Sequence, residues 1–198
     1  MRFILLLLLV VCSSLADAGS LANWSANDPP CNRHAELLIQ GHMDLGVRVA
    51  TSNPVLAREF RRAMDTWASV LDLNWHEDDS QNCSIQLIDG ARQLFQPATI
   101  AARSQLPDRL DFDGCIAFNP GQALNPAELY QISLHEIGHV LGLRHSLNSN
   151  SIMYSFNLEG QDWLDLTDLA ELAAHHKLRI ALSNKPVRLA GAATRVRQ

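Results

Sequence analysis

Between residues 44 and 120, apolar and polar side chains alternate along several short stretches, which predicts the strands of a sheet. The clearest example is residues 44–51, where apolar side chains recur at every second position. Residues 114–120 form a short apolar run closed by a proline, a pattern typical of a buried strand. We expect further strands at residues 71–76, 83–89 and 98–104.

A spacing of three and four residues between apolar side chains runs through residues 52–71 and predicts an amphipathic helix. Ser52 or Asn53 can cap its N-terminus. Pro54 suits the first helical position, because the backbone there needs no N–H donor.

Two more helices are expected nearer the C-terminus. One begins near Pro126 and ends at Gly142. The other covers residues 166–179, with Thr167 as its cap and basic residues at its end, where they complement the helix dipole.

The N-terminal residues have the layout of a secretory signal peptide. Arg2 precedes an apolar run over residues 3–11, and a small-residue pattern follows that ends at Ala18. The run is too short to span a bilayer as a helix of the mature protein. We therefore expect cleavage after Ala18 and export to the extracellular space or the periplasm. Lipid attachment at Cys12 is the alternative, although Val11 is large for the residue before a lipidated cysteine.

Length and composition fit one domain, because the chain has 198 residues and 47% of them are apolar. We place this domain at residues 44–182, after a turn-rich N-terminal arm at residues 19–43 and before a disordered tail at residues 183–198. A net charge of −5 gives no electrostatic reason to expect nucleic acid as a partner. We expect a monomer without stable membrane association.

Export changes how the cysteines are interpreted. Cys12 leaves with the signal peptide, so Cys31, Cys83 and Cys115 meet an oxidising compartment. Because three is an odd number, at most one intramolecular disulfide forms and one thiol remains. The sequence does not choose the pair.

Residues 133–146, SLHEIGHVLGLRHS, place three histidines within eleven positions. On a helix, His135 and His139 lie one turn apart with about 5–6 Å between their β-carbons, so both can reach one metal ion. Gly142 can take the left-handed conformation that ends a helix, and His145 then approaches the ion from another direction. Three nitrogen ligands leave the fourth position of a zinc ion open, which indicates a catalytic rather than a structural site.

Glu136 favours the catalytic interpretation, because it lies beside the metal-facing side of the helix without being centred on it. From there its carboxylate can hydrogen-bond a zinc-bound water and accept a proton as a general base. The pattern H-E-x-x-H-x-x-G-x-x-H arises by chance in a chain of this size on the order of once in 10⁵.

The motif resembles the zinc motif of the metzincin metalloproteases, and SIMYS at residues 151–155 resembles their Met-turn. Among metzincins the chain is most similar to the matrixins, because Ser146 follows the third histidine, Met153 lies eight residues after His145, and Tyr154 comes next. The resemblance implies an α+β fold. Its sheet is expected to be twisted and mostly parallel with an antiparallel edge strand, beside an active-site helix and a C-terminal helix.

The resemblance also implies roles for particular residues. Met153 would form an apolar floor beneath the metal without binding it. Residues 98–104 would be the edge strand above the cleft, where a peptide substrate pairs with the backbone; the candidates are Ile100, Ala101 and Ala102. Residues 154–161, beginning with Tyr154, would form the wall of the pocket for the side chain after the cut bond.

The chain departs from the matrixin pattern in several places. Residues 89–114 lack the histidine–aspartate set that holds a second, structural zinc in animal matrixins, so we expect one zinc ion. DFDG at residues 111–114 is acidic and turn-like, but it is not a clear calcium motif. PPCN at residues 29–32 weakly resembles the cysteine switch of latent matrixins, and a disulfide through Cys31 is the alternative. Surface or helix-end positions are expected for the remaining histidines, His34, His42, His76, His175 and His176.

Together these patterns predict a secreted, zinc-dependent endopeptidase in which Glu136 is the general base and a peptide or protein is the substrate. One alternative is a zinc-bearing module that holds peptides without cutting them, although such a module would need neither Glu136 nor an open ligand position. The other is an amidase restricted to cell-wall peptides, because the short segment 89–114 is compatible with a narrow substrate range.

Overall fold

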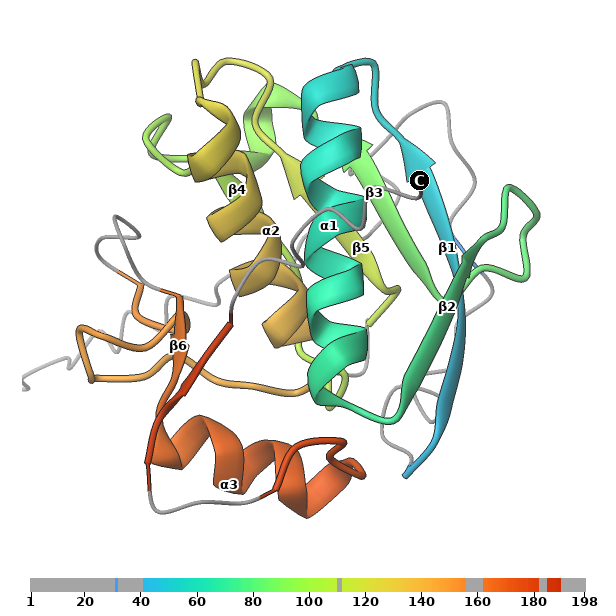
Figure 1. Ribbon diagram of the computed structural model, residues 1–198. Helices are drawn as coiled ribbons and strands as arrows, with labels where there is room; N and C mark the ends of the chain where they lie inside the picture. The colour runs from blue at the N-terminus through green and yellow to red at the C-terminus, as the bar shows by residue number, and fades with distance from the viewer. Residues whose placement is uncertain (1–30, 32–40, 110–111, 156–161, 182–184, 190–198) are drawn as a thin grey trace, which may run out of the picture.

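The computed structural model describes residue 31 and residues 41–109, 112–155, 162–181 and 185–189. Its centre is a five-stranded sheet in the order β2-β1-β3-β5-β4, and two helices, α1 and α2, lie together across one face of it (Figure 1). The elements are β1 (Met43–Ala50), α1 (Pro54–Val70), β2 (Leu73–Glu77), β3 (Ile85–Asp89), the 3-10 helix η3 (Arg92–Leu94), β4 (Ala102–Arg103), β5 (Cys115–Phe118), α2 (Pro126–Val140), β6 (Trp163–Leu164), α3 (Leu166–His175) and β7 (Val187–Arg188).

The sheet is parallel except at one edge. Strand β1 pairs in parallel with β2 and β3, and β3 pairs in parallel with β5. Strand β4 pairs antiparallel with β5, with Ala102 opposite Phe118. All four residues of β5 are buried, as expected for a strand with neighbours on both sides. The predicted α+β architecture, with its mostly parallel sheet and antiparallel edge strand, is confirmed.

The predicted first helix is confirmed as α1, and Asn53 rather than Ser52 caps it. The Asn53 side chain accepts hydrogen bonds from the backbone N–H groups of Val55 and Leu56, at 3.0 and 3.2 Å. Along its buried face Trp67 is fully enclosed and donates from Nε1 to the carbonyl of Leu134 in α2 at 3.1 Å. This bond and the surrounding apolar contacts hold α1 against α2.

Helix α3 starts at Leu166 as predicted, but its capping residue and its end differ from the prediction. Asp165, not Thr167, is the cap, because its carboxylate accepts from the backbone N–H groups of Thr167 and Asp168 at 2.8 and 2.9 Å. The Asp168 carboxylate accepts in return from the Asp165 N–H at 2.9 Å, which completes a capping box. The helix ends at His175, because the residues after it pair with the chain around Leu71 instead.

The edge strand is shorter than predicted. Only Ala102–Arg103 of the expected 98–104 form β4. The side chain of Asn119 explains the difference, because its amide donates to the carbonyls of Ala98 and Ile100 at 3.2 and 2.9 Å. These two carbonyls therefore accept hydrogen bonds from a side chain, whereas in a longer strand they would accept from the backbone of a neighbouring strand.

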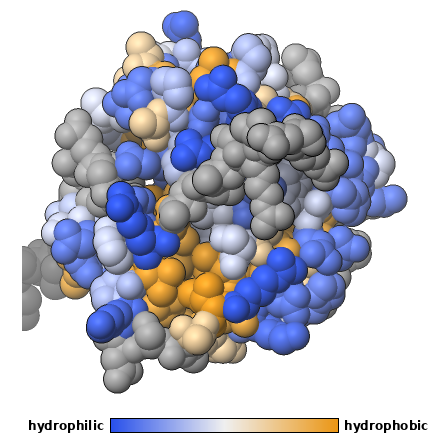
Figure 2. Space-filling model, in the orientation of Figure 1, coloured by the Kyte–Doolittle hydropathy of each residue, from blue (hydrophilic) through white to orange (hydrophobic). Residues whose placement is uncertain are grey.

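A two-stranded ribbon was not predicted. Strand β6 pairs antiparallel with β7, whose residues lie within the 183–198 segment expected to be a disordered tail. That expectation is wrong for Val187–Arg188, because backbone pairing and the burial of Leu189 fix this part of the chain. Figure 2 shows apolar side chains gathered between the helix pair and α3 on the face seen in Figure 1, with hydrophilic surface on either side.

The cysteine pairing that the sequence left open is also settled. Cys31 and Cys83 form a disulfide, and Cys115 is a buried free cysteine. The signal segment 1–18 and the arm as far as residue 40 lie outside the described residues, apart from Cys31. No helix in the described ranges combines the length and apolar composition that a bilayer crossing requires.

Candidate metal centre

Helix α2 carries two of the three clustered histidines, and its N-terminus is firmly capped. The Asn125 side chain accepts from the N–H of Ala127 at 2.9 Å and of Glu128 at 3.1 Å. The Glu128 carboxylate in turn accepts from the Asn125 N–H at 2.7 Å, and Pro126 occupies the first helical turn as predicted. This capping box fixes where the helix starts.

The end of α2 also follows the prediction. Gly142 has φ +98°, the left-handed conformation that favours glycine. Two hydrogen bonds close the turn, from the Gly142 N–H to the His139 carbonyl and from the Leu143 N–H to the Gly138 carbonyl, both 2.9 Å. The chain then reverses, and His145 returns toward the helix.

The structure brings the three predicted histidines together. One nitrogen from each of His135, His139 and His145 lies within 4.8 Å of the others, and this is the one such cluster of potential metal ligands in the described residues. The Nε2 atoms of His139 and His145 are 3.1 Å apart. His135 is buried, His139 is half-buried and His145 is exposed, so the cluster is open to solvent on one side.

Hydrogen bonds on the far side of two rings determine which nitrogens are free. His135 donates from Nδ1 to the Ile152 carbonyl, and His139 donates from Nδ1 to the Leu143 carbonyl, both at 2.7 Å. Burial lowers the pKa of each of these imidazoles to about 4, so both are neutral near pH 7. A neutral ring that donates through Nδ1 presents a lone pair at Nε2.

These features fit a zinc ion. Nitrogens at ~2.0–2.1 Å from a tetrahedral zinc lie about 3.3 Å from each other, close to the 3.1 Å between His139 and His145. Lone pairs that face one another at this distance need a shared cation or proton between them. Carbonyl acceptors behind the rings are the usual outer partners of metal-binding imidazoles. The cluster therefore has the donor set and the spacing of a zinc site.

The predicted Met-turn packs directly against α2. Met153 is fully buried, and a β-carbon added at Gly138 would lie 2.6 Å from its sulfur. Glycine at 138, directly before His139, is therefore what lets the turn approach. Hydrogen bonds from Met153 N–H to Ser151 Oγ and from Ser146 N–H to the Met153 carbonyl, both 2.9 Å, hold the turn in place.

Two acidic residues that support the centre were missed by sequence reasoning. Asp165 accepts from Ser146 Oγ at 2.9 Å, and Asp168 accepts from Ser151 Oγ at 2.6 Å. The capping box of α3 thus holds both the residue after His145 and the Met-turn. The D-x-x-D spacing of the box is a sequence signal that could have identified these two residues as a cap.

Glu136 is buried beside the histidines and lines the same cleft. The hydroxyl of Ser104 donates to its Oε2 at 2.5 Å. Burial raises the pKa of Glu136, while His139 and the Ser104 hydroxyl act in the opposite direction. Ser104 was not identified from the sequence, because no local pattern connects it with a residue 32 positions away.

The cleft has a volume of about 740 Å³ and runs between the β4 segment and α2. The three candidate substrate-binding residues Ile100, Ala101 and Ala102 all line it, although only Ala102 belongs to β4. After the Met-turn, Ser155 lines the cleft, whereas Tyr154 forms a β-bridge with Ser146. Most of the predicted wall, residues 156–161, lies outside the described residues.

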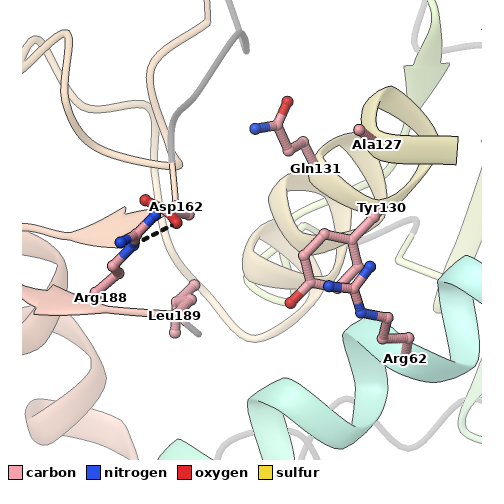
Figure 3. A pocket seen from close by; sticks show the side chains of 7 residues that line it. All are labelled: Arg62, Ala127, Tyr130, Gln131, Asp162, Arg188 and Leu189. Atoms are coloured by element: carbon pink, nitrogen blue, oxygen red, sulfur yellow. Dashed lines mark hydrogen bonds and ion pairs between the residues drawn. The ribbon is translucent and has the colours of Figure 1, made fainter. Parts of the chain in front are cut away.

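A second, smaller cavity of about 390 Å³ lies between α1, α2 and the β6–β7 ribbon (Figure 3). We call it the arginine hollow; it is lined by Arg62, Ala127, Tyr130, Gln131, Asp162, Arg188 and Leu189. Gln131 also lines the cleft that contains the histidine cluster, which we call the metal cleft. Arg62 stacks 4.0 Å above the ring of Tyr130, and Arg188 donates to Asp162 at 2.7 Å.

In the DFDG stretch, Asp113 is buried and its carboxylate accepts a hydrogen bond from the Cys115 N–H at 3.0 Å, so one of its oxygens stabilises the local backbone. His176 lies at the helix end, as the C-cap of α3, which is one of the two expected positions, but it is buried rather than on the surface, and its Nε2 donates to the Leu141 carbonyl at 2.7 Å. His42, His76 and His175 are exposed as predicted, and His34 lies outside the described residues.

Comparisons with known proteins agree with this geometry. The family model described as Matrixin matches residues 47–171. The chain is 30% identical over 112 residues to metalloendoproteinase 4-MMP of Arabidopsis thaliana, a match that covers 50% of this chain and 33% of that protein. It is 24% identical over 144 residues to matrix metalloproteinase-A of Caenorhabditis elegans, covering 65% and 27%. It is 30% identical over 128 residues to matrix metalloproteinase-16 of Rattus norvegicus, covering 52% and 20%.

The chain thus spans a third or less of the length of these relatives. The family match, in contrast, covers more than half of the chain and includes β3, β5, all of α2, the third histidine and the Met-turn. Family model, sheet topology and histidine cluster lead to one conclusion: the chain belongs to the matrixins, the metalloendopeptidases of peptidase family M10.

Proposed function

We propose that residues 44–182 form a zinc-dependent endopeptidase domain in which His135, His139 and His145 bind the metal through Nε2 and Glu136 is the general base. One observation carries the proposal: three imidazoles converge on one point beside a buried carboxylate, inside a cleft that an extended peptide can enter. A structural zinc site needs the convergence but neither the carboxylate nor the cleft.

A zinc ion held at this point would polarise the carbonyl of a peptide bond and acidify a water molecule. The protein supplies the other parts of the reaction. Glu136 takes a proton from the attacking water and delivers it to the nitrogen of the departing amine. The backbone carbonyls of Ile152 and Leu143 keep His135 and His139 in the tautomer that leaves Nε2 free.

The substrate is proposed to be a peptide in extended form that pairs with the edge of the sheet. The carbonyl of Ala101 is already used, because it accepts from the Asn119 N–H at 2.8 Å. Since backbone groups point to alternate sides along a strand, those of Ala102 face away from β5 and are open to pairing. A peptide paired in this way would lie across the cleft in front of Glu136.

We also propose that the chain is exported after removal of residues 1–18. The Cys31–Cys83 disulfide supports export, because such bonds persist in oxidising compartments. The same bond engages the sulfur of Cys31, so a latency role for its thiolate is not part of the proposal.

The test is cleavage of a peptide library by purified protein, with its zinc content measured before and after treatment with a chelator. We expect about one zinc per chain, cleavage within peptides, loss of cleavage with the metal, and recovery when zinc is restored. Zinc-loaded protein that binds peptides but cuts none would refute the proposal in favour of a binding module.

A further inference from the structure

The carboxylate of Glu136 is held at one of its two oxygens. Ser104 Oγ lies 2.5 Å from Oε2, within the range of a hydroxyl that donates to a charged carboxylate. Among the described residues, Ser104 is the only hydrogen-bond partner of this carboxylate. The Glu136 backbone carbonyl is 3.2 Å from the same hydroxyl, so Ser104 contacts both ends of one residue.

A carboxylate that acts as a general base must present one oxygen to the water and cannot turn freely. The χ3 torsion of glutamate is broad, so burial alone leaves the plane of the carboxylate poorly fixed. A hydrogen bond at Oε2 fixes that plane and leaves Oε1 to exchange the proton. A hydroxyl suits this position because it brings no charge of its own into the cleft.

Ser104 is also well placed along the chain. It directly follows β4, whose last residue is Arg103, so it lies at the end of the strand proposed to pair with substrate. It is half-buried and lines the cleft, where a bound peptide would cover it. Only Arg103 separates Ser104 from Ala102, the residue whose backbone is proposed to pair with the substrate.

We propose that Ser104 is a positioning residue for the reaction: its hydroxyl holds Oε2 of Glu136 so that Oε1 faces the attacking water. The proposal rests on the proposed function, because positioning a base has meaning only if Glu136 is one. The Ser104 hydroxyl bonds to Glu136 and not to a proposed metal ligand, so its effect is exerted through Glu136.

The experiment compares Ser104→Ala with Ser104→Thr and with a matched control on α2, Ser133→Ala. Ser133 is buried two residues before His135, and its hydroxyl donates to the Leu129 backbone carbonyl at 2.7 Å, so its removal does not touch Glu136. For each protein we would measure kcat and KM, zinc affinity, the Kd of a peptide with a non-cleavable bond, and the midpoint of thermal unfolding.

Loss of the Ser104 hydroxyl is expected to lower kcat by about 10- to 100-fold, a part of the ~10²- to 10⁴-fold that a correctly positioned general base contributes. KM, zinc affinity and peptide Kd should stay within about twofold of wild type. Threonine should restore most of kcat, because it keeps the hydroxyl, and Ser133→Ala should resemble wild type.

Three results would overturn the proposal while leaving the endopeptidase intact. One is an unchanged kcat in Ser104→Ala. Another is a loss of zinc or peptide binding that accounts for the loss of rate, which would make the role structural. The third is a threonine variant as slow as the alanine variant. Wild-type protein that cuts nothing would instead overturn the proposed function itself.

Discussion

The metal cleft and the arginine hollow share the wall formed by Gln131, yet their polar groups are in opposite situations. In the hollow, Arg62 donates to Glu59 and Arg188 to Asp162, so both guanidinium groups have a carboxylate partner. In the cleft, backbone carbonyls accept from the Nδ1 atoms of His135 and His139, and one nitrogen of each of these rings converges with a nitrogen of His145 within 4.8 Å. The charged groups of the arginine hollow are paired with one another or with a neighbour, whereas the histidine nitrogens of the cleft are arranged to bind a ligand.

This contrast shows what distinguishes a reactive site from an ordinary hollow. Volume alone does not, since both cavities could admit a side chain. The distinguishing feature is a set of donor atoms held in position from behind, with their reactive side left unpaired.

Replacing Glu136 with alanine tests the cleft most directly. We expect cleavage to fall by about 10³-fold or more, because proton transfer from water then lacks its acceptor. Zinc content should stay near that of wild type, since the three histidines are untouched. Peptidase assays together with metal analysis measure both quantities. Activity within tenfold of wild type would mean that another group is the base.

Gly138→Ala tests the support behind the histidines. The added methyl group would lie 2.6 Å from the buried sulfur of Met153, so one of them must move. We expect the free energy of unfolding to fall by about 1–3 kcal/mol through overpacking, partly offset by the better helix propensity of alanine. Denaturant titration measures this change.

The control for that variant is the same substitution made in Met153→Ala protein. Removing the methionine side chain makes room, so Gly138→Ala should cost less there than in wild type. Equal costs in the two backgrounds would show that the close packing of helix and Met-turn is not the cause.

Asp168 gives a pH-dependent test of the same support. Burial raises the pKa of Asp168 to about 6, with Asp165 and Glu171 adding to the effect and the Ser151 hydroxyl opposing it. The unfolded chain loses this proton near pH ~3.9. The contribution of protonated Asp168 to the free energy of unfolding is therefore full below about pH 4 and is lost as the pH rises through 6. Asp168→Asn removes the titration, so its stability relative to wild type should rise between pH 4 and 7.

A surface carboxylate provides a control of opposite sign. Hydrogen bonds from Lys177 and His42 lower the pKa of Asp72 to about 2, so its contribution is present above about pH 4 and is lost as the pH falls toward 2. Asp72→Asn should therefore lose stability relative to wild type as the pH rises from 2 to 5. If the two variants show the same sign of pH dependence, the account of Asp168 is wrong.

Arg188→Gln should have the smallest effect. The ion pair with Asp162 has one largely exposed partner, and such pairs contribute about 0–1 kcal/mol. We expect a shift of a few degrees or less in the midpoint of thermal unfolding and cleavage rates within twofold of wild type. A fivefold loss of cleavage would contradict this expectation and would mean that the arginine hollow takes part in substrate binding.

The parts of the structure that sequence could predict are those whose signals are local. The 3.6-residue pattern of 52–71, the proline and glycine that bound α2, and the four-residue spacing of two histidines all depend on close neighbours in the chain. Each of them agrees with the structure. The assignment of metal-ligand and general-base roles to these residues stays a prediction until the variants are measured.

The parts that sequence missed depend on distant partners. Strand β4 is short because Asn119, about twenty residues away, binds the carbonyls that would have extended it. Strands β6 and β7 have two residues each, too few for an alternating pattern to appear. Ser104 and Asp168 acquire their roles only when folding brings them to Glu136 and Ser151.

The shared carboxylates of the α3 cap have a thermodynamic consequence. Asp165 and Asp168 hold the first turn of the helix and also grip the segment that presents His145 and Met153. Formation of the helix and ordering of that segment are therefore linked equilibria, and linkage is reciprocal. Metal bound at the histidines should protect the amide protons of α3 from exchange. A change that unfolds the first turn of α3 should weaken the affinity for metal, and the free energy lost in metal binding should equal the free energy by which bound metal stabilises that turn. A helix that touches no ligand would in this way help to set how tightly the ion is held.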